Sequence, residues 1–139
     1  MDPVFTKLAP QASIIGLYFS ADYCRYCKEF TPVLVELYPQ LLDNNIDIVL
    51  VSSDKTIDKY DEYRSTQPWS ALPFDTHELR SSLREQYDIK TIPALLFFDA
   101  KQGTLIAANG RDMVRDDRSR VIKSLTESIM LQYDSDEDF

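Results

Sequence analysis

Glycine, cysteine and histidine are scarce in this chain of 139 residues. The three glycines, Gly16, Gly103 and Gly110, stand far apart, which excludes the clustered glycines of dinucleotide and P-loop sites. One histidine, His77, and two cysteines cannot supply the four nitrogen or sulfur ligands of a structural zinc site within one chain. We therefore predict no metal and no bound cofactor.

Basic charge is also in short supply. The chain has 23 acidic residues against 15 basic ones, a net charge of −8. This balance lacks the basic footprint of a nucleic-acid-binding protein and disfavours acidic lipid. The apolar stretch 14–19 is far shorter than the roughly twenty residues that span a bilayer. The acidic residues that crowd the C-terminus predict a disordered tail over 133–139.

The cysteine content bears on the compartment. Two cysteines with only two residues between them cannot build a disulfide framework, and the N-terminus has no positively charged segment followed by an apolar one. We expect a reducing intracellular compartment, the cytoplasm, with the nucleus as the alternative.

Hydrophobic patterning assigns most of the rest of the chain to strands and helices. The apolar runs predict four strands, at 13–20, 46–51, 94–98 and 104–108. Stripes with three- and four-residue steps predict helices, at 24–42, 55–64, 75–87 and 116–131. Pro32 should kink the first of these helices, and residues 75–78 resemble a capping box that starts the third.

The order of these elements predicts an α/β fold. The first strand, helix and second strand form a βαβ unit with parallel strands, and the short turn at 99–103 makes the last two strands an antiparallel hairpin. We therefore expect a central mixed four-stranded sheet with helices on both faces. The length predicts a single domain, which we assign to residues 1–132.

The segment Cys24-Arg25-Tyr26-Cys27 carries the chemistry. Both cysteines follow the first strand and begin the next helix, where unpaired N–H groups and the helix dipole favour an anion. Arg25 adds a positive charge, so these effects together favour the thiolate of Cys24. A thiolate is the nucleophile of thiol–disulfide exchange. We predict that Cys24 attacks and that Cys27, one turn further and buried, resolves the mixed disulfide.

Two other interpretations fit the same pair. The cysteines could be incidental core residues, since a C-x-x-C segment also arises by chance. They could instead hold half of an iron–sulfur cluster shared across a dimer, because such clusters need four ligands. The position at a strand-to-helix turn favours the redox interpretation.

Three separated motifs resemble one protein family. Cys24-x-x-Cys27-Lys28 with Pro32, and the distant Thr91-Ile92-Pro93, resemble the thioredoxin superfamily. The wider segment 18–32, the segment 68–74 and the segment 89–93 resemble its tryparedoxin and nucleoredoxin branch. The resemblance covers about residues 17–116 and implies a thioredoxin fold.

The resemblance also implies roles for particular residues. Pro93 would be a cis-proline that faces the cysteines, and the backbone of Ile92 would pair with an extended substrate; otherwise Pro93 is a strand-entry proline. Trp69 would lie at the rim of the site or pack in the core. Tyr18 could relay a proton and so tune the dithiol, as Arg25 does by charge, or fill the core.

Two departures from the branch surround the dithiol. Tyr23 stands where the family usually has tryptophan, and Arg25-Tyr26 replaces the usual Pro-Pro. Tyr23, Tyr26 and Trp69 could form an aromatic patch that binds an apolar protein substrate, or their rings could only shield the disulfide. A cation beside the thiolate stabilises the reduced form. We therefore predict a reduction potential higher than that of thioredoxin, which is about −270 mV.

The resulting hypothesis is a monomeric thiol–disulfide oxidoreductase that reduces protein disulfides. The resemblance implies a peroxiredoxin or another protein as acceptor. It implies a small dithiol, trypanothione or glutathione-like, or a reductase as electron donor. The alternative is a binding module in which the same fold holds partners and redox activity is weak or absent.

Overall fold

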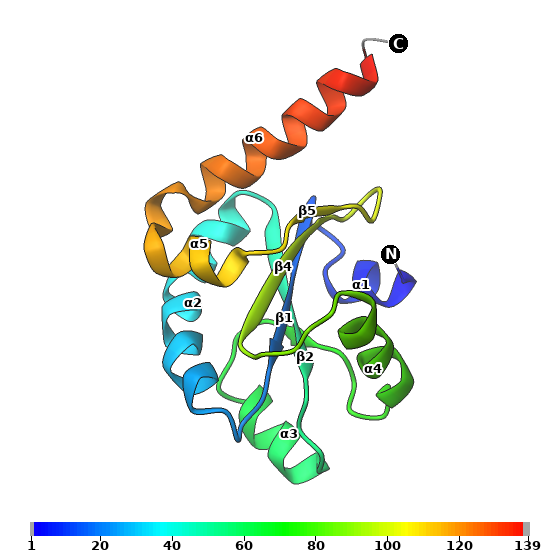
Figure 1. Ribbon diagram of the computed structural model, residues 1–139, viewed down its shortest axis with the longest axis vertical. Helices are drawn as coiled ribbons and strands as arrows, with labels where there is room; N and C mark the ends of the chain where they lie inside the picture. The colour runs from blue at the N-terminus through cyan, green and yellow to red at the C-terminus, as the bar shows by residue number, and fades with distance from the viewer. Residues whose placement is uncertain (1, 138–139) are drawn as a thin grey trace.

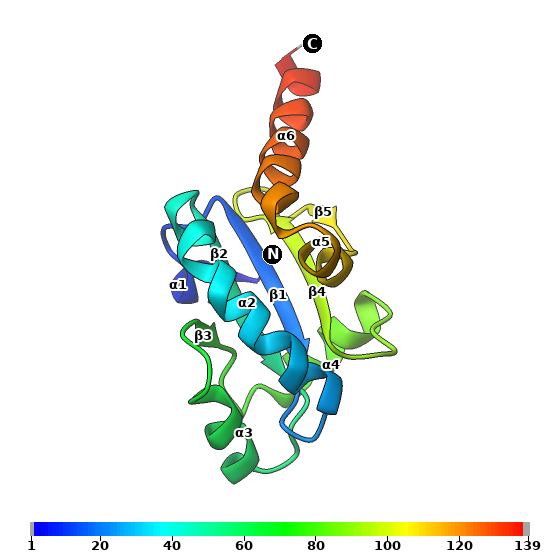
Figure 2. The same ribbon diagram turned by 90° about the vertical axis from the view of Figure 1, so that its left-hand side faces the viewer.

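The computed structural model describes residues 2–137. Five strands form one sheet in the order β3-β2-β1-β4-β5, and helices pack on both faces (Figures 1 and 2). The strands are β1 (Ile14–Ser20), β2 (Ile46–Ser52), β3 (Ser70–Ala71), β4 (Ala94–Asp99) and β5 (Leu105–Ala107). The helices are α1 (Pro3–Leu8), α2 (Arg25–Asp43), α3 (Ile57–Arg64), α4 (His77–Gln86), α5 (Gly110–Asp116) and α6 (Arg118–Glu137).

Strand β1 lies at the centre of the sheet. It pairs parallel with β2, from Ile14 opposite Ile46 to Ser20 opposite Ser52, and antiparallel with β4 on its other side. Every residue of β1 is buried, which explains why its sequence is apolar without alternation. The predicted βαβ unit and mixed sheet are confirmed, and the chain that leaves β1 enters helix α2 directly.

The sheet has five strands where the sequence predicts four. The additional strand, β3, pairs parallel with β2 through two residues only. Pro68 and Pro73 flank it, and two residues are too few to show a strand period, so the sequence predicts a loop there. The predicted α/β architecture is otherwise unchanged.

Two short helices were not predicted. Helix α1 starts at Pro3, where the Asp2 carboxylate accepts the backbone N–H of Val4 at 2.9 Å, the arrangement that favours a helix N-terminus. Helix α5 starts at Gly110, where the chain passes so close to β4 that an added Cβ would lie 2.6 Å from the Leu95 carbonyl oxygen.

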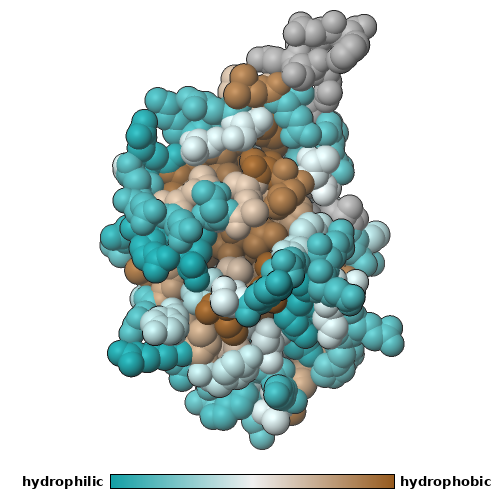
Figure 3. All heavy atoms as spheres, viewed as in Figure 1, coloured by the Kyte–Doolittle hydropathy of each residue, from teal (hydrophilic) through white to brown (hydrophobic). Residues whose placement is uncertain are grey.

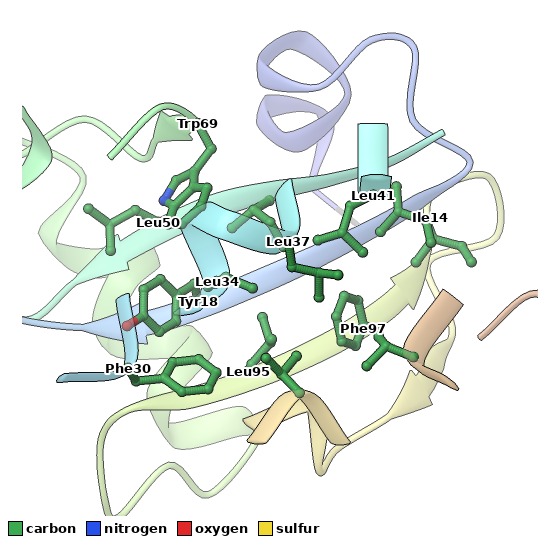
Figure 4. Close-up of a cluster of buried hydrophobic side chains, with 14 of the residues drawn as sticks. Ile14, Tyr18, Phe30, Leu34, Leu37, Leu41, Leu50, Trp69, Leu95 and Phe97 are labelled. Atoms are coloured by element: carbon green, nitrogen blue, oxygen red, sulfur yellow. The ribbon is translucent and has the colours of Figure 1, made fainter. Parts of the chain in front are cut away.

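Two apolar layers lie on opposite faces of the sheet. Helices α2, α5 and α6 cover the face toward which Ile14 and Tyr18 point, and Figure 4 shows this layer between the sheet and α2. Helices α1 and α4 cover the other face, with Phe5 and Leu83 among the buried residues. At the sheet's edge, apolar residues gather over β4 and β5 (Figure 3), where Leu105 is exposed.

The predicted capping box does not form at the start of α4. Thr76 occupies the N-cap without a side-chain cap bond, because its hydroxyl donates instead to the Pro73 carbonyl at 2.6 Å. Buried Arg80 ties this helix to the sheet by donating to the carbonyl oxygens of Ser52 at 2.7 Å and Phe74 at 2.6 Å.

Helix α6 is longer than predicted and projects beyond the rest of the domain (Figure 1). Its backbone includes residues 133–137 of the acidic tail. The tail's last two residues lie outside the described part of the chain, and disorder of the tail stays a prediction. Among residues 2–137, no helix is long and apolar enough to cross a membrane.

Candidate active site

The two cysteines occupy the start of helix α2, directly after the central strand. Cys24 is the N-cap residue, with extended backbone angles, and its sulfur accepts the backbone N–H of Cys27 at 3.2 Å. Cys24 is partly exposed and Cys27 is buried. A helix N-terminus favours a negative charge, so the accessible sulfur is the one that meets the helix dipole.

A cis-proline lies opposite the accessible sulfur. The Ile92–Pro93 bond is cis, as the family resemblance implies, and it precedes strand β4. The thiol of Cys24 donates to the carbonyl oxygen of Ile92 at 3.6 Å. The loop before β4 and the loop after β1 therefore meet at the nucleophile, because β1 and β4 are neighbouring antiparallel strands.

Burial separates the two thiols chemically. It raises the pKa of Cys27 to about 12, and the nearby sulfur of Cys24 adds to this shift. A hydrogen bond with the Ser20 hydroxyl acts in the opposite direction. Cys27 is thus a protonated thiol at neutral pH and cannot compete with Cys24 for an incoming disulfide.

Arg25 forms an ion pair with Glu29, one turn further along helix α2. Its Nε lies 3.3 Å from a carboxylate oxygen of Glu29, and both side chains are largely exposed. An exposed pair of this kind is screened by water. The guanidinium of Arg25 is therefore paired with Glu29 at the surface, and its effect on the dithiol stays a prediction.

Tyr18 is fully buried beneath the dithiol. Its hydroxyl lies 2.7 Å from that of Thr31 and 3.5 Å from the Cys27 carbonyl oxygen. Burial raises its pKa far above the ordinary range of tyrosine. Tyr18 fills the core, as one of the two sequence interpretations holds, and it also presents a protonated hydroxyl below Cys27.

Trp69 does not lie at the rim of the site. Only 4% of it is exposed, its ring stands edge-on to Tyr18 and Tyr38, and its N–H donates to Gln67 at 2.9 Å. Figure 4 shows it above Leu50 in the core. Trp69 therefore does not contribute to an aromatic patch around Cys24, whereas Tyr23 and Tyr26 are 66% and 69% exposed.

A groove beside Tyr26 was not predicted from the sequence. It has a volume of about 670 Å³ and an apolar lining that includes Phe30 and Pro93, with three arginines of α5 and α6 along it. One of them, Arg111, donates to the Pro93 carbonyl oxygen at 3.2 Å. The apolar stripe of α2 indicated Phe30, whereas Arg111 carried no pattern that pointed to the site.

Three hydroxyl residues near Cys27 were also missed. Ser20 ends β1, Thr31 lies within α2 and Tyr63 lies in α3, and all three are buried. Their hydroxyls bond to one another and to Tyr18. Isolated serines and threonines carry no sequence pattern of their own, so only the packing of α3 against β1 reveals this cluster.

A helix-capping dithiol opposite a cis-proline, on a sheet of this topology, is the arrangement of a thioredoxin-type protein. A family model described as Thioredoxin-like matches residues 12–105. The chain belongs to this family, and its relatives place it in the nucleoredoxin and tryparedoxin branch.

The relatives differ in how much of their length the chain covers. It is 38% identical over 109 residues to nucleoredoxin of Xenopus laevis, covering 76% of this chain and 26% of that protein. It is 37% identical over 110 residues to tryparedoxin of Trypanosoma brucei brucei, covering 76% of each. The chain thus spans about a quarter of the nucleoredoxins it matches.

Solved structures of tryparedoxins share the fold. Tryparedoxin II complexed with glutathionylspermidine superposes with a TM-score of 0.77 at 31% identity, covering 81% of this chain and 80% of that one. Tryparedoxin from Trypanosoma brucei gives a TM-score of 0.76 at 34% identity, covering 80% and 78%.

Proposed function

We propose that this protein reduces disulfide bonds of other proteins through Cys24 and Cys27. The observation that carries the proposal is the inequality of the two thiols. Cys24 is partly exposed and caps a helix, whereas Cys27 is buried and protonated, its pKa raised to about 12. The Cys24 sulfur can therefore attack a substrate disulfide while Cys27 remains a protonated thiol until the second step.

Thiol–disulfide exchange with the substrate takes place in two steps. The Cys24 thiolate attacks a substrate disulfide, forms a mixed disulfide and releases one substrate sulfur as a thiolate, which takes up a proton. Cys27 then attacks the sulfur of Cys24. This forms the Cys24–Cys27 disulfide, and the thiol proton of Cys27 leaves with the second substrate sulfur. Two electrons pass from the dithiol to the substrate.

An external donor must then return two electrons to the disulfide. We propose a small dithiol, trypanothione or glutathione-like, or a reductase as that donor. The similarity to a tryparedoxin complexed with glutathionylspermidine supports the first of these. A peroxiredoxin is the acceptor that similarity to tryparedoxins favours.

The same proposal includes the setting. A dithiol that donates electrons must be kept reduced, which supports the cytoplasm, or the nucleus, over an oxidising compartment. We also propose a monomer as the working unit.

The test is reduction of insulin with dithiothreitol as donor, comparing native protein, Cys24→Ser and Cys27→Ser. We expect Cys24→Ser to abolish catalysis, and Cys27→Ser to accumulate a mixed disulfide with the substrate. Equal turnover by native protein and Cys24→Ser would contradict the proposal. Binding of insulin without reduction by native protein would instead support the binding module.

A further inference from the structure

Four buried hydroxyl groups form a continuous chain of hydrogen bonds near Cys27, the proposed resolving cysteine. The Tyr18 hydroxyl lies 2.7 Å from that of Thr31, the Thr31 hydroxyl lies 3.0 Å from that of Tyr63, and the Tyr63 hydroxyl bonds to that of Ser20. Ser20 is also the side-chain hydrogen-bond partner that lowers the pKa of Cys27. All five residues are at most 5% exposed.

Counting hydrogens fixes the direction of this chain when Cys27 is a thiol. The Thr31 hydroxyl donates to the Cys27 carbonyl oxygen at 2.8 Å, so its only hydrogen is used. Tyr63 must then donate to Thr31, and Ser20 must donate to Tyr63. The Ser20 oxygen is left as the acceptor for the Cys27 thiol.

The same four groups can also run in the opposite direction. When Cys27 is a thiolate, Ser20 turns its hydrogen toward the sulfur and Tyr63 donates to Ser20. Thr31 then turns its hydrogen away from the Cys27 carbonyl oxygen and donates to Tyr63. Tyr18 donates to Thr31 in both arrangements. Three hydroxyl hydrogens rotate, and no proton passes from one oxygen to another.

We infer that this hydroxyl chain switches direction during catalysis and stabilises Cys27 as it becomes the resolving nucleophile. Ser20 is the hydrogen-bond donor to the reacting sulfur, and Tyr63 is the positioning residue that turns Ser20. The inference deepens the proposed function by assigning residues to its second step.

The groups around Cys27 explain why its sulfur needs a hydrogen-bond donor when it is a thiolate. The groups that shift the pKa of Cys27 are the Cys24 thiol, the Ser20 hydroxyl and the Ala21 backbone, together with burial. A buried thiolate without a donor would be costly. Burial also raises the pKa values of Tyr18 and Tyr63, so both remain protonated donors. The thiol proton of Cys27 leaves with the departing substrate sulfur, and the hydroxyl chain remains neutral.

The experiment is a single turnover of the reduced protein with dithionitrobenzoate, followed by the absorbance of released thionitrobenzoate. Attack by Cys24 gives a first phase that depends on reagent concentration. Resolution by Cys27 gives a second phase that does not. We expect Ser20→Ala to slow the second phase about tenfold or more at neutral pH, as loss of a hydrogen bond to a charged group predicts. The first phase should stay within about twofold, because Ser20 is assigned to the second step only.

A pH profile separates this role from simple loss of packing. The second phase of Ser20→Ala should recover as pH rises, because bulk ionisation of Cys27 then replaces the missing donor. Tyr63→Phe keeps the ring and should slow the second phase by roughly threefold or more. Tyr60→Phe is the matched control, since this buried hydroxyl in the same helix donates to the Leu72 carbonyl at 2.7 Å, outside the chain.

The outcomes are distinct. Second phases of Ser20→Ala and Tyr63→Phe that match the native protein would overturn the inference while leaving the proposed function intact. Equal slowing by Tyr60→Phe and Tyr63→Phe would overturn it as well. Native protein that releases a single equivalent of thionitrobenzoate per chain would contradict the proposed function itself. Should Ser20→Ala fail to fold, Tyr63→Phe and its control decide the question.

Discussion

The sulfur of Cys24 accepts the backbone N–H of Cys27 at 3.2 Å and so takes the place of a serine or aspartate at a helix N-cap. N-cap side chains accept the free N–H groups of the first turn, and an anion is favoured there. The bond links the proposed nucleophile to the residue that we propose displaces the substrate from it.

Selective alkylation should reveal the inequality of the two thiols. With limiting iodoacetamide at neutral pH, we expect one adduct per chain, on Cys24, because Cys27 is buried with a pKa of about 12. Modification of Cys27 should be at least about a hundredfold slower. Peptide mass spectrometry locates the adduct, and denatured protein provides the control. Comparable labelling of both cysteines in the folded protein would contradict the assignment.

The stability of the reduced protein should fall at alkaline pH. The folded chain raises the pKa of Cys27 from 9.0 to about 12, so the unfolded state loses this proton first. The contribution is complete below about pH 9 and is lost as pH rises toward about 12, with a slope of up to about 1.4 kcal/mol per pH unit.

This slope is measured as the difference in unfolding free energy between native protein and Cys27→Ala at several pH values. The subtraction removes the buried tyrosines, which also titrate in this range. Cys24→Ala serves as the control and should retain most of the native slope, because burial, the largest cause of the raised pKa of Cys27, is unchanged. A difference between native protein and Cys27→Ala that does not change above pH 9 would exclude the linkage.

Replacement of Trp69 should damage stability through the core. Its ring contacts Tyr18 and Tyr38 and is almost fully buried. We expect Trp69→Ala to lower the unfolding free energy by about 3–5 kcal/mol, measured by urea denaturation. Tyr23→Ala, at an exposed aromatic, should change it by less than about 0.5 kcal/mol. Equal effects of the two variants would contradict the placement of Trp69 in the core.

The ion pair between Arg25 and Glu29 should adjust the redox potential by a small amount. Glu29→Gln frees the guanidinium, which favours the thiolate and raises the potential, and Arg25→Ala lowers it. Because the pair is exposed, each change should be no more than about 20 mV. Equilibration with glutathione measures all three proteins. A higher potential in Arg25→Ala would reverse the expected sign, and a native value at or below about −270 mV would contradict an oxidising couple.

Gly110 holds helix α5 against strand β4. An added Cβ would lie 2.6 Å from the Leu95 carbonyl oxygen, so Gly110→Ala must push α5 outward and carry Arg111 away from Pro93. We expect a loss of about 1–3 kcal/mol in unfolding free energy. Asn109→Ala, at an exposed neighbour without a side-chain cap bond, should cost less than about 0.5 kcal/mol. Unchanged stability of Gly110→Ala would contradict this close approach.

The sequence predicts those parts of the fold that have a strong local pattern. Strands β1 and β4 are apolar up to their last residue, and β2 is apolar from Ile48 to Val51. Helix α2 keeps an apolar stripe despite two internal prolines. The dithiol could be placed because it stands where one pattern gives way to the other. Strand β3 and helix α5 were missed because a two-residue strand and a seven-residue helix are too short to show a period.

The site was predictable only where its residues are close in sequence. Cys24 and Cys27 belong to one turn, whereas Tyr63 reaches Ser20 across 43 positions. No local pattern reports such a contact, because it depends on how α3 packs against β1. Trp69 shows the same limit, since its motif suggested two locations and only its contacts with Tyr18 and Tyr38 decide between them.

The central position of β1 has a consequence for how the protein opens. Its backbone is bonded to β2 on one side and β4 on the other over nearly its whole length, whereas β3 and β5 are short and peripheral. Amide hydrogens of Ile14–Ser20 should therefore be among the last to exchange with deuterated solvent. Fluctuations that melt the periphery should therefore leave intact the strand that leads into the dithiol helix.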